Sequence, residues 1–479
     1  MIFGKNNSIH QISYLSRNKQ HEFMKDELSK SSYGDLGVKN DKKTIRSWAF
    51  FDWANSAYNL VITSTIFPAY YTAITGDKDD NTIDYVYFFG YKIINSALYT
   101  YAMAFAFLVI AILSPILSSI ADTRGNKKIF MKMFTYIGAI ACSALFFFEI
   151  NADKGVNTLN FSVIMFVIAA VGFWGSLVFY NSYLPEIATV EEQDNVSAKG
   201  FTFGYVGSII LQIICFVFVF KPEWFGIVDA SVPARLSFLL VGIWWIGFAQ
   251  IPFRNLPKGS PNFKTEKKNI MSSGFQELNK VWKQVKQMKY LKRFLFAFFF
   301  YSMGVQTVML VATIFGEKIL HLPTTKLIAT ILILQLVAIP GAMLMSYLSS
   351  KRFGNVNVLI GVVIIWIGSC ISAYFIHTEM QFYALAAVIG LIMGGIQSLS
   401  RSTYSKFLPQ SSPDHTSFFS FYDVTEKVAL VFGMFSFGYI EVLSGSMRNS
   451  VIALALFFVF GLVFLLLLKK VEPKAVVVD

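Results

Sequence analysis

The sequence has few charged residues. Asp, Glu, Lys and Arg make up 15% of its 479 residues, against about 25% in an average soluble domain. Hydrophobic residues make up 55% and aromatic residues 16%, including 49 Phe. This composition leaves too little polar surface for a soluble globular protein, so we expect the chain to fold in a lipid bilayer.

Cysteine is scarce as well, and the motifs of common enzymes are missing. The three cysteines, Cys142, Cys215 and Cys370, lie in apolar segments without paired spacing, which argues against disulfides and metal sites. The sequence has no Walker-type Gly-Lys-Ser loop, no His-Glu-x-x-His motif and no dinucleotide fingerprint. We therefore predict that the protein is not an enzyme, binds no cofactor or metal and is not a nucleotide-driven pump.

Long apolar runs are what the sequence has in abundance. Each run is long enough to cross a hydrocarbon core of about 30 Å as a helix. The runs cover residues 48–74, 92–117, 129–150, 160–184, 200–220, 234–253, 293–315, 324–349, 356–376, 380–400, 418–442 and 447–468. They predict an all-α membrane protein with twelve transmembrane helices.

The positive charge is distributed unevenly over these runs. The formal net charge is +12, and most of the 41 Lys and Arg lie in the first 47 residues, the central polar segment, the tail after Lys469 and two short loops. Basic loops remain on the inner side of a membrane, so we predict a cell (inner) membrane protein with both termini in the cytoplasm. The basic excess then reflects topology and attraction to anionic lipid, and we expect no nucleic-acid partner.

The chain divides into two six-helix halves at its longest internal polar segment. The predicted parts are a polar N-terminal tail (1–46) without a signal-peptide core, a first half (47–254), a linker (255–291), a second half (292–468) and a C-terminal tail (469–479). In the linker, apolar residues recur at helical spacing between lysines, which predicts a basic amphipathic helix along the cytoplasmic surface. Both a plain tether and a gating role fit this pattern.

The loop after the second span carries a short motif made of Asp122, Arg124, Gly125, Lys127 and Lys128. It resembles the signature loop of the major facilitator superfamily, in which an acid, a glycine and basic residues latch the cytoplasmic gate. The loop after the eighth span is a weaker copy, because it has Lys351 where the acid would fall. The resemblance implies a gate latch in the first half and alternating access between the halves.

A narrower resemblance extends over almost all of both halves. The runs that carry it are Asp52-Trp53-Ala54-Asn55-Ser56-Ala57, residues 114–117 (Ser-Pro-Ile-Leu), 181–188 (Asn-Ser-Tyr-Leu-Pro-Glu-Ile-Ala), 204–207 (Gly-Tyr-Val-Gly), 394–402 (Gly-Gly-Ile-Gln-Ser-Leu-Ser-Arg-Ser) and 421–423 (Phe-Tyr-Asp). The sequence resembles the bacterial branch of the "unknown major facilitator" family, related to the autophagy-linked vacuolar effluxer of fungi. That resemblance implies amino acids or short peptides as substrates. Members of the family usually carry an Asn-Asp pair in the seventh span, where this chain has Ser302 and Met303.

Ionisable residues inside the spans are the candidates for proton coupling or gating. Asp52 lies one turn after Trp48, which we expect at the membrane interface. In a functional interpretation, Asp52 exchanges protons or meets a cationic group of the substrate. In the alternative, it is an acid in the first turn of a helix, hydrated by water of the headgroup region. Asp423 and Lys427 have the i, i+4 spacing of a helical ion pair, which is a proton relay or a structural pair. Glu426 has no obvious local partner, and for Glu186 we expect a contact with the basic loops of the gate.

Polar residues near these groups are the candidates for the substrate path. They are Asn55, Ser56, Asn59, Tyr301, Gln306, Gln397 and Arg401. Arg401, at a span end, either binds a substrate carboxylate or reaches to the lipid headgroups. Gly200, Gly204 and Gly207 have the small-residue spacing of a tightly packed helix.

These observations predict a monomeric secondary transporter that moves a small polar solute through the membrane, with protons as the coupling ion and lipid as its surroundings. Two alternatives remain open on sequence alone. One is a receptor or scaffold that uses the same fold without transport, and the other is a lipid flippase with a laterally open apolar cavity.

Overall fold

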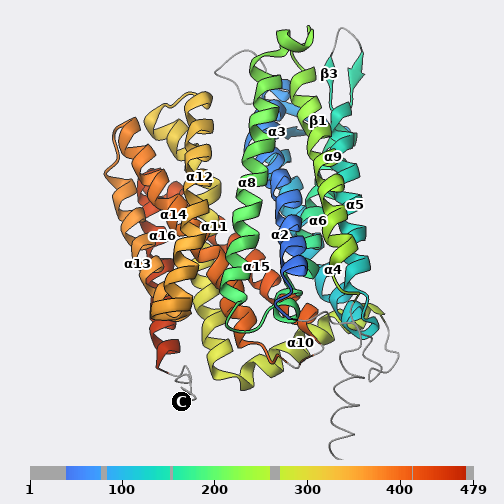
Figure 1. Cartoon of the computed structure of the whole chain (residues 1–479). Coiled ribbons are helices and arrows are strands. Elements are labelled where there is room, and N and C mark those ends of the chain that lie inside the picture. The colour runs from blue at the N-terminus through green and yellow to red at the C-terminus, as the bar shows by residue number, and fades with distance from the viewer. Residues whose placement is uncertain are drawn as a thin grey trace, which may run out of the picture.

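The computed structural model describes residues 39–76, 84–151, 155–258, 270–410, 412 and 414–470. Most of the predicted N-terminal tail, the linker segment 259–269 and residues 471–479 lie outside this part of the chain. The described part is a bundle of long helices in two groups, which run side by side in Figure 1.

The first group contains the first six predicted spans. Its elements are α2 (Lys42–Tyr58), η1 (Asn59–Thr65), α3 (Ile66–Thr75), β1 (Tyr85–Phe88), β2 (Tyr91–Ile94), α4 (Asn95–Arg124), α5 (Lys127–Ala144), η2 (Leu145–Phe147), β3 (Ile150–Asn151), β4 (Val156–Asn157), α6 (Leu159–Asn181), α7 (Leu184–Ile187), α8 (Gln193–Phe220), η3 (Pro222–Phe225) and α9 (Val232–Asn255). The strands form two antiparallel hairpins, β1–β2 and β3–β4, so the fold is helical apart from these short additions.

The second group follows the linker helix α10 (Ile270–Gln287). Its elements are α11 (Lys289–Leu320), α12 (Thr324–Leu348), η4 (Ser349–Phe353), α13 (Asn355–Tyr374), α14 (Glu379–Phe407), α15 (His415–Ser444) and α16 (Met447–Lys469). Buried apolar side chains form two clusters, one drawn from residues 48–256 and the other from 281–468 together with Tyr205. Each group of helices therefore has a core of its own.

Eleven helices of the described chain are long and apolar enough to cross a membrane. They correspond to the second to twelfth predicted spans. The first predicted span differs because it is not one α-helix: α2 and α3 are joined by the π-helical stretch η1. In η1 the Thr65 hydroxyl donates to the Leu60 carbonyl (2.7 Å) and to Gln212 Oε1 of α8 (2.8 Å), so a contact between helices accompanies the break in the α-helical pattern.

The two ends of the bundle are distinct. We call the end where α2 begins, α10 lies and α16 ends the linker end, and the opposite end, which carries β1–β2 and β3–β4, the hairpin end (Figure 1). At the linker end Asp41 caps α2, accepting a hydrogen bond from the Thr44 amide (2.8 Å). The hydrogen bonds from Thr44 lower the pKa of Asp41.

The linker helix α10 packs against the bundle rather than lying free along a surface. It contacts α4 of the first group and α11 and α15 of the second. Val281 and Val285 are buried, and Trp282 stacks on Phe421 with ring centroids 5.9 Å apart. The linker thus contains a helix as predicted, and part of the apolar stripe of this helix is covered by protein; its place along the cytoplasmic surface stays a prediction.

Candidate functional site

The two groups of helices meet at the linker end through an ion pair. Asp52 of α2 lies 3.3 Å from Arg401 Nη1 of α14, and the two side chains are only 7% and 4% exposed. Asp52 Oδ2 also accepts a hydrogen bond from the Tyr180 hydroxyl of α6 (2.7 Å). The prediction that Arg401 reaches to lipid headgroups is wrong, because Asp52 and the neighbouring helices enclose its guanidinium.

Arg401 has partners for all three of its nitrogens. Nε donates to the Ser197 hydroxyl (2.9 Å), Nη2 to the Ser197 carbonyl (2.8 Å) and Nη1 to Asn181 Oδ1 (3.1 Å). The guanidinium carbon also lies 4.2 Å from the centroid of the Phe201 ring. Ser197, Asn181 and Phe201 belong to the first half. The guanidinium of Arg401, from the second half, therefore lies in a polar and aromatic pocket that the first half provides.

Trp48 completes the aromatic setting of Arg401. It is fully buried, stacks on Tyr180 with ring centroids 4.4 Å apart and donates its indole N–H to the Tyr180 carbonyl (3.0 Å). The guanidinium of Arg401 lies 4.8 Å from the Trp48 ring centroid. Trp48 therefore packs inside the protein against the Asp52–Arg401 pair, and its expected depth at the membrane interface stays a prediction.

Glycine at position 200 makes room for the ion pair. A Cβ atom there would lie 2.6 Å from Asp52 Oδ2 and 2.8 Å from Arg401 Nη2. Gly204 and Gly207 likewise allow α8 to approach Ser56 and Trp53 of α2. The predicted close packing of this helix is confirmed, and at Gly200 it also shapes the charged contact.

A second contact between the halves is formed by the signature loop. Asp122, near the end of α4, accepts hydrogen bonds from the backbone amides of Thr416 (3.1 Å) and Ser417 (2.7 Å) and from the Ser417 hydroxyl (2.8 Å). These amides lie in the first turn of α15, where unpaired N–H groups and the helix dipole favour an anion. Gly125 ends α4 with a φ of 63°, which glycine adopts without strain.

The neighbouring residues of the motif contribute in different ways. Lys127 pairs with Glu186 at 2.5 Å, and Glu186 Oε1 also lies 3.6 Å from His415 Nδ1 of the second half. The expected contact between Glu186 and the basic loop is therefore present. Lys128 donates to the carbonyl of Leu256, whereas Arg124 is exposed.

The weaker second copy of the motif also reaches across the halves, through a residue that sequence reasoning missed. Asp194, at the start of α8, is fully buried. It accepts hydrogen bonds from Ser349 (2.9 Å) and Asn355 (2.7 Å) and pairs with Lys406 at 2.6 Å. In the first loop the acid belongs to the loop and the donors to the facing helix. In the second loop the roles are reversed, because the acid belongs to the facing helix and the loop supplies neutral donors.

A third charged group lies deeper in the bundle, on α15. Lys427 Nζ is 3.3 Å from Asp423 Oδ1 and 3.2 Å from Glu426 Oε2, so the predicted i, i+4 pair is present. Gln306 Nε2 of α11 donates to Glu426 Oε1 (2.9 Å). The expectation that Glu426 lacks a partner is wrong, because a neighbouring lysine and another helix supply two.

The remaining candidates for the substrate path do not form one cluster. Gln397 accepts from the Tyr205 hydroxyl across the halves (2.8 Å), and Tyr301 shares a hydrogen bond with Ser400 of its own half (2.7 Å). Asn55 is buried with its Oδ1 unpaired among the described residues, and Asn59 is half-buried.

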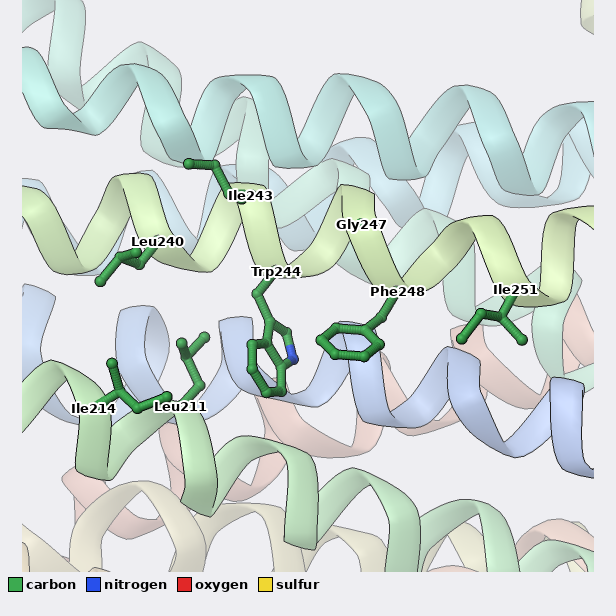
Figure 2. A pocket seen from close by; sticks show the side chains of 8 residues that line it. All are labelled: Leu211, Ile214, Leu240, Ile243, Trp244, Gly247, Phe248 and Ile251. Atoms are coloured by element: carbon green, nitrogen blue, oxygen red, sulfur yellow. The ribbon is translucent and has the colours of Figure 1, made fainter.

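An apolar groove of about 470 Å³ lies on the first half, lined from α8 and α9 (Figure 2). Its eight lining residues, none of them charged, are Leu211, Ile214, Leu240, Ile243, Trp244, Gly247, Phe248 and Ile251. The indole N–H of Trp244 is bonded to the Trp53 carbonyl of α2 (3.2 Å). The groove therefore lies within the first half and is separate from the charged contacts that join the two halves.

Solved structures with the same arrangement of helices include major facilitator transporters. The fucose transporter FucP in the outward conformation matches with a TM-score of 0.61 and 14% identity over 90% of this chain and 99% of its own. A bacterial homologue of the iron transporter ferroportin in an outward-facing state matches with a TM-score of 0.64 and 11% identity over 90% of this chain and 100% of its own. At such identities the likeness shows the fold.

Relatives found by sequence comparison have higher sequence identity to this chain. The uncharacterized MFS-type transporter YxiO of Bacillus subtilis is 32% identical over 429 residues, covering 89% of this chain and 95% of its own. Autophagy-related protein 22 of Saccharomyces cerevisiae is 25% identical over 403 residues, covering 74% of each chain. The family described as "Vacuole effluxer Atg22 like" matches residues 40–475. The chain therefore belongs to the Atg22-like family and is a multi-pass membrane transporter of the major facilitator type.

Proposed function

We propose that the protein is a monomeric secondary transporter that moves a small polar solute, an amino acid or short peptide, by alternating access coupled to protons. The observation that carries the proposal is the Asp52–Arg401 pair, because its two charges come from opposite halves and are buried at one end of the bundle. A path that opens at this end has to separate them. Such a pair is a gate that opens and closes with the rocking of the halves.

The contacts described above support a state that is closed at the linker end. Asp52–Arg401, Asp122 with the start of α15, and Asp194–Lys406 all hold the halves together there. Two structural neighbours are described as outward-facing or in the outward conformation. We therefore take the linker end as the cytoplasmic end, with both termini inside, which agrees with its basic residues Lys351 and Arg352.

Amino acids are the leading substrate class because the family resemblance implies them and because relatives are described as vacuole effluxers. Proton coupling is supported by the intramembrane acids Asp52, Asp423 and Glu426, since ionisable groups inside a membrane are costly and rare and mark ion pathways and proton relays. A structural neighbour, FucP, is described as a fucose:proton symporter. A non-transporting scaffold is less consistent with charges buried between two moving halves.

The test is uptake of labelled amino acids and dipeptides into proteoliposomes that contain the full-length protein, with and without an imposed pH gradient. We expect at least one compound to accumulate, faster with the gradient, and Asp52→Asn to abolish the accumulation. The matched control is Glu223→Gln, which removes an exposed acid in η3 and should leave uptake unchanged. If no amino acid or dipeptide moves under either condition, the substrate class is wrong.

A further inference from the structure

The Lys427 group differs from the Arg401 group in its charge balance. Asp52 and Arg401 carry one charge of each sign, and every nitrogen of the guanidinium has a partner. Lys427, in contrast, stands between two carboxylates, those of Asp423 and Glu426. With all three ionised, the group carries one excess negative charge.

Among the described residues, the groups that face Lys427 and Glu426 from other helices supply no charge that would balance this excess. The groups that face Lys427 are Phe107 of α4, Trp174 of α6 and, through Glu426, Gln306 of α11, all of them neutral. The membrane-embedded stretches of these three helices contain no charged residue. An unbalanced charge in such surroundings is strongly unfavourable, so the group favours one additional positive charge.

Polar atoms without hydrogen-bond partners and an aromatic ring lie beside Lys427. Asp423 Oδ2 is buried and has no hydrogen-bond partner among the described residues, although its side chain is only 10% exposed. Trp174 presents its ring to the Lys427 ammonium at 3.5 Å from the centroid, and its own indole N–H is unpaired in the described structure. Carboxylate oxygens beside an aromatic face form the setting that binds ammonium groups.

We propose that Asp423 and Glu426 bind the ammonium group of the substrate, which supplies the missing positive charge, beside the Lys427 ammonium that already lies against the Trp174 ring. Glu426 is the point of entry because its side chain is 21% exposed, the largest fraction among the three charged side chains. The site lies between the halves, since α15 carries the charges and α6 carries the tryptophan. Rocking of the halves therefore separates the carboxylates from the aromatic face and loosens the bound ammonium.

This inference rests on the proposed function for the identity of the substrate, and its test measures binding alone. The probe is isoamylamine, which is leucine without its carboxylate, and the matched anion is 4-methylpentanoate, which is leucine without its amine. Binding is followed through the shift in unfolding temperature of the full-length protein in detergent. We expect isoamylamine to bind and 4-methylpentanoate not to bind.

Charge counting predicts an unusual pattern among variants. Glu426→Gln brings the group to neutrality and should weaken isoamylamine binding roughly thirtyfold or more. Adding Lys427→Met to that variant restores one excess negative charge and should restore most of the binding. Lys427→Met alone should bind isoamylamine at least as tightly as the unchanged protein, whereas a lysine that binds the substrate's carboxylate would predict a loss.

The outcomes separate the two proposals. If isoamylamine fails to bind the unchanged protein, or if the double variant binds no better than Glu426→Gln while it remains monodisperse, the ammonium site is wrong. Should the double variant not fold, Lys427→Met alone decides, because weaker binding would overturn the proposal. Amino-acid uptake without amine binding would leave the transport function standing, and charge-dependent amine binding without uptake would leave the site standing.

Discussion

Replacing Asp52 by Asn removes the charge from the buried pair while keeping the shape of the side chain. The amide oxygen of Asn can still accept a hydrogen bond from the Tyr180 hydroxyl, so the variant leaves no cavity and no large void in the packing. Arg401 keeps Ser197, Asn181 and its aromatic neighbours but loses the one carboxylate that pairs with it in the described part of the chain. The closed linker end should therefore become less stable relative to the open one.

The size of this effect follows from the geometry. Two unit charges 3.3 Å apart interact by about 5 kcal/mol at an effective dielectric constant of 20. The neutral amide recovers part of this energy, and the guanidinium regains hydration when the halves separate, so we expect a net loss of about 2–3 kcal/mol for the closed state. That loss corresponds to a roughly 30- to 150-fold shift of the equilibrium toward the open linker end.

The shift can be measured as chemical accessibility. Ser420 is fully buried at the linker end, where its hydroxyl lies 2.6 Å from that of Ser114. In a background without the native cysteines, Ser420→Cys should react slowly with a membrane-impermeant maleimide in inside-out vesicles. Adding Asp52→Asn should raise the reaction rate by at least tenfold, and adding Glu223→Gln should not. Equal rates with and without Asp52→Asn would refute the view that this pair holds the gate.

Three further variants test the same interface. Gly200→Ala would place a Cβ inside the buried ion pair and should raise linker-end labelling as the loss of the charge does. Ser114→Cys with Ser420→Cys should form a disulfide between the halves under mild oxidation, since the two hydroxyls are in contact, and uptake should stop and then return on reduction. Asp194→Asn leaves Lys406 without its carboxylate and should lower the free energy of unfolding by about 2–4 kcal/mol in detergent, measured by thermal unfolding.

Features that depend on neighbouring residues could be predicted from the sequence. The apolar runs predicted the helices because each span is long and lipid dictates helical hydrogen bonding. The spacing of Asp423 and Lys427 predicted their pair because both stand on one helix. The break in the first span was missed, since hydropathy is the same whether a backbone bonds in α-helical or π-helical register.

Contacts between the halves depend on folding and were largely missed. Asp52 and Arg401 are 349 residues apart, and nothing in either local pattern names the other as a partner. The partner of Asp52 in the second half is a cation, which the comparison of Ser302 and Met303 with the Asn-Asp pair of relatives does not reveal. One signal was available: Glu186 and Lys406 end corresponding spans of the two halves with opposite charges, which indicates that their partners differ in sign as well.

The acids and cations of the three contacts that hold the halves together are sorted by half. The first half contributes the acids Asp52, Asp122 and Asp194, and the second contributes Arg401, Lys406 and the amide-rich start of α15. Opening this end therefore exposes these acids on one half and their partners on the other to water, and the Coulomb energy lost is exchanged for hydration. Salt screens exposed charges more than buried ones. Higher ionic strength should therefore stabilise the open state, in which these charges are exposed, more than the closed state. This distribution of charge also favours one relative position of the two halves in the closed state, since each acid meets a cation or the start of a helix only in that position.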